Sequence, residues 1–321
     1  MTDPAGEPSL TIAVLTYKRV EQLVPLIHIL REQAEKSDAT ASILVVDNDP
    51  DASARLPASA AVLGAGRYVH EPTPGIAAAR NRALREATNS SLLVFIDDDE
   101  VPVEGWLQQL FDEYLRSWPV AVVGPVVSSY EKQPEPWIEA GRFFARRRLA
   151  SGTRVDVAAT NNLLLDLEWL RRQGIEFDDA FGLSGGSDTL FSRQITAAGG
   201  EIVWCDEAVV HDMVPASRAT RTWVLQRAYR SGNSWSRSSL ALEASGVGRA
   251  RVRTVLIARG TVRYVGGAIR ELVGRVAGRL DAEAQGTRTR RRGAGMIAGA
   301  VGRVYSEYAR PHTVFSTTEK A

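Results

Sequence analysis

Residues 91–99 of the chain read SLLVFIDDD, an uninterrupted apolar run that ends in three aspartates. Near-continuous apolar runs of this kind are typical of strands that are buried on both faces of a parallel sheet. Amphipathic, helix-like stretches near residues 20–33 and 76–87 precede this run. The earlier strand-like runs are 10–17 (LTIAVLTY), 41–48 (ASILVVDN) and the short 67–70. Their alternation with helices predicts an α/β fold with a mostly parallel sheet flanked by helices.

The pattern continues less regularly beyond residue 100. A helix near 104–116 and a strand near 120–127 are expected, and the polar, aromatic stretch 131–155 predicts a long loop or β excursion. Strands are expected at 157–166 and 201–210, and a helix at 188–198 behind the turn GLSGGSD. From residue 218 the chain is expected to be helical, in segments 249–280 and 293–309 with a loop at 281–292. We therefore predict an α/β domain over 1–217, a basic helical region over 218–310 and a disordered tail over 311–321.

The composition of the 321 residues is that of a globular protein, with 44% hydrophobic and 24% charged side chains. The lone Cys205 excludes an intrachain disulfide and a cysteine-rich metal site. The first residues, MTDPAGEPSL, have neither the positive region nor the apolar core of a signal peptide. No apolar run reaches the roughly 18 residues of a transmembrane helix. We expect a cytoplasmic protein.

The net charge of +1 hides an asymmetry between the two parts of the chain. Residues 1–220 carry 20 basic and 32 acidic side chains, whereas residues 221–310 carry 18 arginines and five acids. A basic region of this kind is attracted to anionic surfaces such as phospholipid. Nucleic acid is not expected as a partner, because no recognised module or aromatic-basic interleaving accompanies the charge.

Polar side chains follow three of the predicted strands at the point where each strand ends. In open α/β sheets this edge binds ligands. Three adjacent carboxylates repel one another, and a hard divalent cation shared with a phosphate-bearing ligand would relieve that repulsion. A solvated loop or a helix N-cap is the alternative explanation of the same residues. The clusters are Thr16–Arg19, Asp47–Asp49 and Asp97–Glu100.

Many spaced motifs in one order carry a resemblance to a known family. They are IAVLTYKR (12–19), ILVVDNDP (43–50), YVHEPTPGIAAARNRAL (68–84), LLVFIDDDEVPVEGWL (92–107), NNLLL (161–165), FGLSGGSDTLFSRQ (181–194) and VWCDEAVVHDMVP (203–215). From Leu10 to His211 the chain resembles the family-2 glycosyltransferases, inverting enzymes of GT-A fold. Within them it is most similar to the succinoglycan-type bacterial exopolysaccharide glucosyltransferases. Past about residue 240 no family signature is present.

The resemblance implies a nucleotide-sugar site at the strand ends. The aspartates 97–99 match the DxD element of the family, in which the last carboxylate, Asp99, holds a divalent metal (Mn²⁺ or Mg²⁺) on the donor diphosphate. Asp97 and Asp98 then face the ribose and base, and Asp47 accepts a hydrogen bond from uracil. The residues implied to bind the UDP-sugar are Thr16, Tyr17, Arg19, Asp47, Gly75, Arg80, Asp97 and Asp98.

The resemblance also implies a catalytic base and a further metal ligand. Asp188 matches the acid that deprotonates the acceptor hydroxyl, although a helix N-cap is the alternative role of an aspartate after a glycine turn. The family more often has glutamate before this acid, where this chain has Ser187. His211 lies where some related enzymes place a metal ligand; a structural histidine is the alternative.

The C-terminal region leaves its role open. It could contact an anionic membrane through its arginines while apolar side chains enter the bilayer surface. It could equally pack on the acidic body or form a homodimer. The apolar side chains in question are Val255, Leu256, Val262, Ile269, Leu272 and Val273.

We predict a metal-dependent, inverting transfer of one hexose from a UDP-sugar to a hydroxyl acceptor. That acceptor is a lipid-linked saccharide, a polysaccharide precursor or a secondary metabolite. The processive motif Gln-x-x-Arg-Trp is missing at Gln226, which favours single-sugar transfer. Arg218, Arg221 and Arg230 are candidates for the pyrophosphate. The alternatives are a haloacid-dehalogenase-type phosphatase and a non-catalytic GT-A membrane scaffold.

Overall fold

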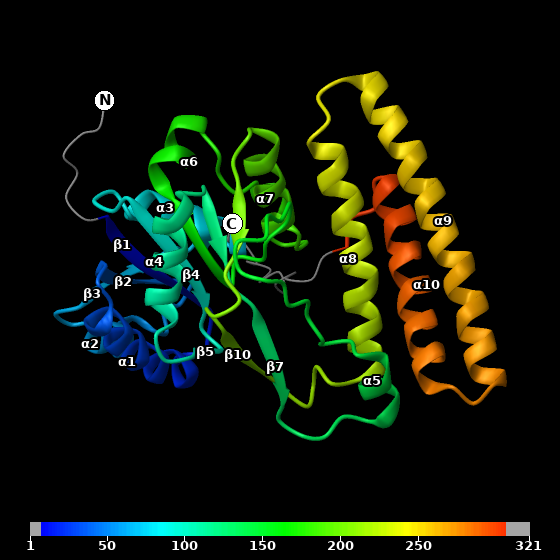
Figure 1. Cartoon of the computed structure of the whole chain (residues 1–321), viewed down its shortest axis with the longest axis horizontal. Helices are drawn as coiled ribbons and strands as arrows, with labels where there is room; N and C mark the ends of the chain where they lie inside the picture. Colours follow the sequence, from blue (N-terminus) through cyan, green and yellow to red (C-terminus); the bar gives the residue numbers. More distant parts are fainter. Residues whose placement is uncertain (1–7, 306–321) are drawn as a thin grey trace, which may run out of the picture.

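The computed structural model describes residues 8–305 (Figure 1). A seven-stranded sheet with strand order β3-β2-β1-β4-β8-β6-β9 lies at its centre. β1 pairs in parallel with β2 and β4, and β2 with β3, whereas β8 runs antiparallel to β4 and β6. β6 and β9 are parallel to each other. The predicted mostly parallel sheet is thus confirmed; its strands are β1 (Ser9–Thr16), β2 (Thr40–Asp47), β3 (Gly66–His70), β4 (Leu92–Asp97), β6 (Ala121–Val123), β8 (Asn162–Asp166) and β9 (Ile202–Trp204).

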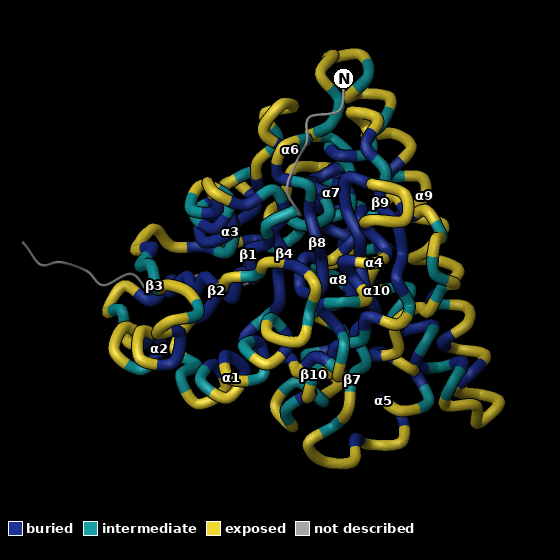
Figure 2. Tube along the Cα trace, turned by 60° about the vertical axis from the view of Figure 1, so that its left-hand side comes forward, coloured by how far each residue is buried: buried dark blue, intermediate teal, exposed yellow. Residues whose placement is uncertain are grey.

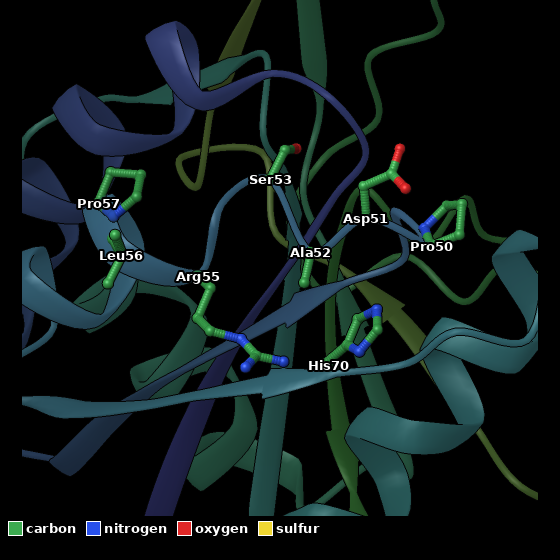
Figure 3. A pocket seen from close by; sticks show the side chains of 8 residues that line it. All are labelled: Pro50, Asp51, Ala52, Ser53, Arg55, Leu56, Pro57 and His70. Atoms are coloured by element: carbon green, nitrogen blue, oxygen red, sulfur yellow. The ribbon is translucent and has the colours of Figure 1, made fainter.

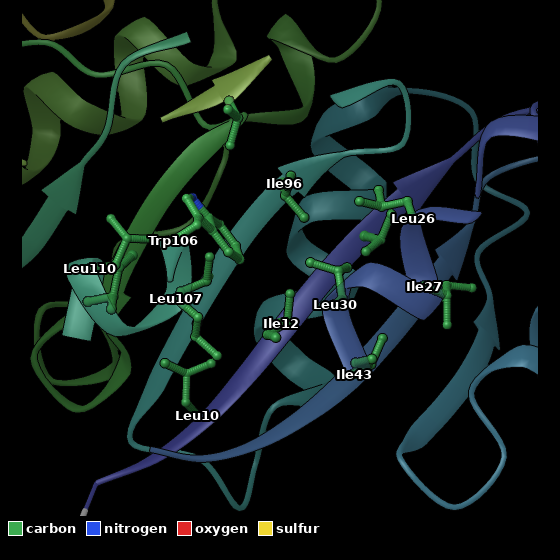
Figure 4. Close-up of a cluster of buried hydrophobic side chains, with 14 of the residues drawn as sticks. Leu10, Ile12, Leu26, Ile27, Leu30, Ile43, Ile96, Trp106, Leu107 and Leu110 are labelled. Atoms are coloured by element: carbon green, nitrogen blue, oxygen red, sulfur yellow. The ribbon is translucent and has the colours of Figure 1, made fainter. Parts of the chain in front are cut away.

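Helices cover both faces of this sheet because successive apolar side chains of each strand point to opposite sides. Ile12 and Val14 of β1 pack in a cluster with α1, α2 and α4. Figure 4 shows Ile12 among side chains of α1 and α4. Ala13 and Leu15 pack in a second cluster with α3, α6 and α7. The two layers are α1 (Val20–Lys36), α2 (Arg55–Ala61) and α4 (Trp106–Ser117) on one face, and α3 (Ile76–Glu86), α6 (Leu167–Gln173) and α7 (Ser187–Ala197) on the other.

A smaller sheet lies beside the main one, with strand order β5-β10-β7. It consists of β5 (Glu100–Pro102), β7 (Val126–Tyr130) and β10 (Val210–Val214). The strand predicted over 201–210 is therefore wrong: its residues contribute to two strands in different sheets, β9 and the start of β10. The long loop predicted at 131–155 contains a short helix, α5 (Pro136–Gly141). Only the second half of the predicted strand 157–166 forms β8.

The C-terminal part is an assembly of three helices, α8 (Arg221–Ala241), α9 (Gly246–Val276) and α10 (Leu280–Ala300). α10 packs between α8 and α9, and α9 lies at the edge of the molecule farthest from the sheet (Figure 1). The predicted loop at 281–292 is wrong, because α10 runs through it. The helix predicted over 293–309 ends at Ala300, its last residues lie outside the described ones, and so does the expected disordered tail 311–321.

Glycines explain why α9 and α10 lie so close together. Gly260, Gly267 and Gly274 recur at seven-residue spacing on α9 and face the backbone of α10. A Cβ at Gly293 of α10 would lie 2.6 Å from the carbonyl oxygen of Gly260. Glycine normally disfavours a helix by about 1 kcal/mol. Here the missing side chains allow direct backbone packing.

This packing predicts opposite effects for two neighbouring glycine substitutions. At Gly267 a Cβ would lie 2.8 Å from the carbonyl oxygen of Gly286, whereas at Gly266 no atom lies within 4 Å. We expect Gly267→Ala to destabilise the protein by about 1–3 kcal/mol through overpacking. Gly266→Ala should be neutral or stabilising by up to about 1 kcal/mol, because alanine favours the helix. Urea unfolding monitored by circular dichroism measures both, and equal stabilities would contradict the close packing.

No helix among residues 8–305 is both long enough and apolar enough to cross a membrane.

Candidate active site

A cavity of about 700 Å³ opens where β1 and β4 end. Its wall includes side chains from the strand ends, from the turn before α7 and from the first turns of α8. The predicted residues that line it are Thr16, Tyr17, Arg19, Gly75, Arg80, Asp97, Asp98, Asp99 and Asp188. Asp47 and His211 do not line it. One cavity therefore brings together the predicted donor site and the predicted base.

A second pocket, of about 470 Å³, lies beside α2 (Figure 3). Residues from Pro50 to Pro57 and His70 line it. None of the predicted site residues faces it, so we assign it no part in the chemistry.

The acidic run is held in place by two side chains at the end of β1 and just beyond it. The Thr16 hydroxyl donates to Asp98 Oδ2 at 2.8 Å. Arg19 Nη1 donates to Asp98 Oδ1 at 2.8 Å and to Asp99 Oδ2 at 2.7 Å. Burial nevertheless raises the pKa of Asp98. Arg19 thus binds two of the three aspartates, and it stabilises a group of charges that would otherwise repel one another.

The pKa values of two further carboxylates, Asp97 and Glu100, are raised. Burial raises the pKa of Asp97 to about 6; Arg80 opposes this shift, and the charges of Asp99 and Asp98 add to it. Burial, together with Asp97, raises the pKa of Glu100 well above its usual value. Asn161 donates to Glu100 Oε1, while Oε2 has no hydrogen-bond partner among the described residues. A cation placed at these carboxylates would relieve both shifts.

These residues fit a hard divalent cation whose shell is completed by a ligand. Asp97 and Asp99 present carboxylate oxygens, the donors that Mg²⁺ and Mn²⁺ prefer. Within residues 8–305 no three His, Cys, Asp or Glu side chains converge as a complete metal site. In proteins, Mg²⁺ is commonly held by one or two carboxylates together with substrate phosphates.

The carboxylate of Asp47 lies behind the cavity wall and organises the loop that follows β2. It is fully buried, and its oxygens accept hydrogen bonds from the backbone N–H groups of Asp49 (2.9 Å) and Ala54 (3.0 Å) and from the Tyr68 hydroxyl (3.0 Å). Asn48 lines the cavity instead. Its side chain donates to the carbonyl oxygen of Glu71 and accepts from the N–H of Gly75. In this structure Asp47 does not face the space where a base would bind.

His211 does not line the cavity either, and β10 continues past it to Val214. Val210 and Val214 are buried and His211 is exposed, so the alternation of the strand places Asp212 on the inner face. Asp212 lines the cavity, 3.6 Å from Arg146 Nη2. The alternation of Val210, Asp212 and Val214 in the sequence could have identified Asp212 as a residue of the inner face. The strand predicted from the sequence ended before Asp212, so this alternation was missed.

Asp188 lies in the first turn of α7, as its position after the glycine turn predicts. Its Oδ1 accepts a hydrogen bond from the N–H of Thr189 at 2.7 Å. The preceding Gly186 has φ +93°, and a Cβ there would lie 2.6 Å from Cβ of Ser234 in α8. Both constraints require glycine. Helix α8 therefore packs directly on the turn that positions the carboxylate.

Ser187, which replaces the more usual acid, is bound to Arg80. Arg80 Nη1 donates to the Ser187 hydroxyl at 2.7 Å, and its guanidinium lies 5.3 Å from the centre of the Phe177 ring. Because serine is neutral, the positive charge of Arg80 is not balanced at this contact. Its charge instead opposes the rise in the pKa of Asp97.

Arginines and aromatic rings form another part of the cavity wall. Arg227 lies 5.5 Å from the ring centres of both Phe144 and Trp223. Burial lowers its pKa to about 10, and the charges of Arg146 and Arg230 add to the effect. Three arginines this close together favour an anionic ligand such as a phosphate.

Of the three arginines left open by the sequence, Arg218 and Arg230 line the cavity and Arg221 does not. Arg218 Nη1 lies 3.7 Å from Asp99 Oδ2. Arg221 donates to Glu135 Oε1 at 2.8 Å, away from the cavity. Since residues beyond 217 line the cavity, the predicted domain boundary runs through the site. No periodicity in the sequence distinguishes Arg227 from the many other arginines of this region.

Comparison with known proteins adds the following. A model of the family described as "Glycosyl transferase family 2" matches residues 11–172. Over 246 residues the chain is 34% identical to the succinoglycan biosynthesis protein ExoM of Rhizobium meliloti (strain 1021). The aligned region covers 74% of this chain and 77% of that protein.

Two solved structures share the fold and confirm the predicted GT-A architecture. The mannosyltransferase PcManGT from Pyrobaculum calidifontis, in complex with GDP-Man and Mn²⁺, superposes with a TM-score of 0.59 at 19% identity, over 93% of this chain and 88% of that one. GalNAc-T7 with UDP, GalNAc and Mn²⁺ gives a TM-score of 0.51 at 13% identity, over 77% of this chain and 54% of that one. At these identities the likeness concerns the fold alone.

Proposed function

Because the chain belongs to glycosyl transferase family 2, we propose that it transfers a single hexose from a UDP-sugar to a hydroxyl acceptor, with inversion and with the help of a divalent metal. One observation carries this proposal: the acidic run Asp97–Asp99 and the carboxylate of Asp188 line the same cavity. A site for the leaving group and a base for the acceptor are the two components that a single displacement requires. Because the chain belongs to a glycosyltransferase family, the phosphatase alternative no longer applies.

On the donor side, we assign the nucleotide to the strand-end wall. Tyr17 and Thr16 lie beside the proposed base and ribose site, and Asn48 replaces Asp47 as the polar side chain that faces it. Asp99, with Asp97 behind it, would hold Mn²⁺ or Mg²⁺. A bound metal would neutralise the charge that develops on the diphosphate as it leaves. Arg19 would keep Asp98 and Asp99 in position.

On the acceptor side, Asp188 accepts the proton of the attacking hydroxyl. The hydroxyl oxygen forms a bond to the anomeric carbon on the face opposite the diphosphate. The bond from that carbon to the phosphate oxygen breaks, and UDP leaves with the electron pair. One displacement of this kind inverts the anomeric centre. The hydrogen bond from the N–H of Thr189 holds the carboxylate in place.

For the acceptor itself, we favour a saccharide that carries a lipid-linked phosphate. The arginine wall, formed by Arg146, Arg227 and Arg230, offers the planar donors that suit a phosphate group. The 34% identical relative is a succinoglycan biosynthesis protein, and this supports a polysaccharide precursor as the acceptor. Such an acceptor would bring the enzyme to the inner face of the cell membrane. A homodimer through the basic helices is the alternative use of that region.

Calorimetry tests the donor part of the proposal. UDP titrated into the full chain should bind saturably with Mn²⁺ present, and binding should be lost in EDTA. GDP titrated under the same conditions serves as the control for nucleotide choice. Absence of UDP binding under both conditions would overturn the assignment of UDP as part of the donor. Equal UDP binding in EDTA and in Mn²⁺ would overturn the proposed role of the metal.

A further inference from the structure

The outer face of α9 exposes a row of apolar side chains. Val262, Ile269 and Val276 follow one another at seven-residue spacing and are 73%, 58% and 82% exposed. Single exposed apolar residues are ordinary on protein surfaces, but a contiguous row along one helix marks an interaction site. We call this row the α9 seam; its members are Val255, Val262, Val265, Ile269, Leu272 and Val276.

The seam points away from the rest of the protein for a geometric reason. Val265 and Ile269 lie two residues to either side of Gly267, and so about 160° around the helix from it. Gly267 faces the backbone of α10. Contact with α10 therefore turns the seam outward, at the edge of the molecule (Figure 1), where Figure 2 colours much of α9 as exposed. Leu256, expected from the sequence on this surface, is instead buried against α10.

The charges on α9 are almost all of one sign. The helix holds seven arginines and one acid, Glu271. Glu271 is buried and already paired with Arg275 at 3.1 Å and Arg290 at 2.8 Å. Arg259 and Arg270 are exposed on the same helix, and Arg270 also donates to Gln285 of α10. A second copy of the chain docked through this helix would bring no exposed acid from α9 to these arginines, whereas anionic lipid headgroups would neutralise them.

We propose that the α9 seam docks on an anionic lipid surface. The helix would lie parallel to the membrane, with the seam among the acyl-chain ends of the headgroup layer and Arg259 and Arg270 on the phosphates. The inference rests on the proposed function only in one respect: docking would bring the cavity to a lipid-linked acceptor. The docking itself needs no substrate, so it can be tested separately from transfer.

Flotation of the full chain with vesicles tests this surface. Vesicles of phosphatidylcholine containing about a third phosphatidylglycerol should bind the protein, and pure phosphatidylcholine should bind it weakly. Val262→Gln/Ile269→Gln should weaken binding at least about tenfold through lost apolar burial. Arg259→Gln/Arg270→Gln should weaken it about 10- to 30-fold, because each arginine contributes about 1 kcal/mol. As a matched control, Leu56→Gln/Leu63→Gln removes two side chains that are 81% and 76% exposed far from α9, and should change nothing.

Every result of this experiment decides the question. Equal vesicle binding by the wild type and the α9 seam variant would overturn the proposal. So would a concentration-dependent dimer in light scattering that the seam variant abolishes while vesicles bind neither protein; that result would assign the seam to a second copy. Metal-dependent UDP binding, measured on every variant, reports that each is folded. Its loss in the wild type would count against the proposed function and not against the docking.

Discussion

Asp188→Asn should lower kcat by about 100- to 10,000-fold, the range that a positioned general base contributes. The side chain keeps an oxygen that can accept the N–H of Thr189, so the first turn of α7 should retain its geometry. What is lost is the capacity to take the proton from the acceptor hydroxyl. Because donor binding does not use this proton transfer, the affinity for UDP should stay within about twofold of the wild type.

The measurement is a single-turnover transfer assay beside UDP calorimetry on the same preparation. Asp179→Asn is the matched control, since it removes an equal charge nearby on an exposed side chain. Turnover of Asp188→Asn close to that of the wild type would show that another group is the base. A joint loss of UDP binding and transfer would instead show that Asp188 supports the fold of the site.

Asp99→Asn should weaken Mn²⁺-dependent UDP binding by about 100-fold, because a metal on the diphosphate contributes several kcal/mol. Arg19 would keep its contact with Asp98, so we expect the strand end to hold its shape. Titration of UDP at several Mn²⁺ concentrations separates the loss of metal from the loss of nucleotide. Asp51→Asn, whose side chain is 81% exposed beside the same sheet edge, provides the control.

Two results would contradict this assignment. Unchanged metal-dependent binding in Asp99→Asn would move the metal to another carboxylate that lines the cavity, such as Asp97. Weakening by the same factor in EDTA and in Mn²⁺ would show that Asp99 contacts the nucleotide directly and holds no metal.

The parts of the fold that follow from short-range patterns could be predicted from the sequence. The apolar runs that became β1, β2 and β4 are buried on both faces, and burial of that kind leaves an unbroken apolar signature. The strand-end polar residues follow from the same topology, since parallel strands bring their carboxyl ends to one edge. Thr16, Arg19 and the aspartates 97–99 accordingly meet in one cavity.

The parts of the fold that depend on contacts between distant segments could not be predicted from the sequence. Helix propensity disfavours the glycines of α10, but the backbones of α9 and α8 pack directly against them. Asp47 has the right residue type at the right strand end, yet the N–H groups of its own loop occupy its oxygens. Arg227 resembles the other arginines of its region until α8 is docked against Phe144.

The docking of α8 has a consequence for how such enzymes diversify. The strand ends that carry the acidic run belong to the α/β body, whereas Trp223, Arg227 and Arg230 belong to a helix that joins the body through a single crossing of the chain. Recombination downstream of β10 could therefore replace the α8 part of the cavity wall and leave the acidic run intact. A lineage could in this way exchange the molecules it modifies while it inherits the same activated sugar. Chimeras joined between residues 215 and 220 would be the laboratory equivalent of that exchange.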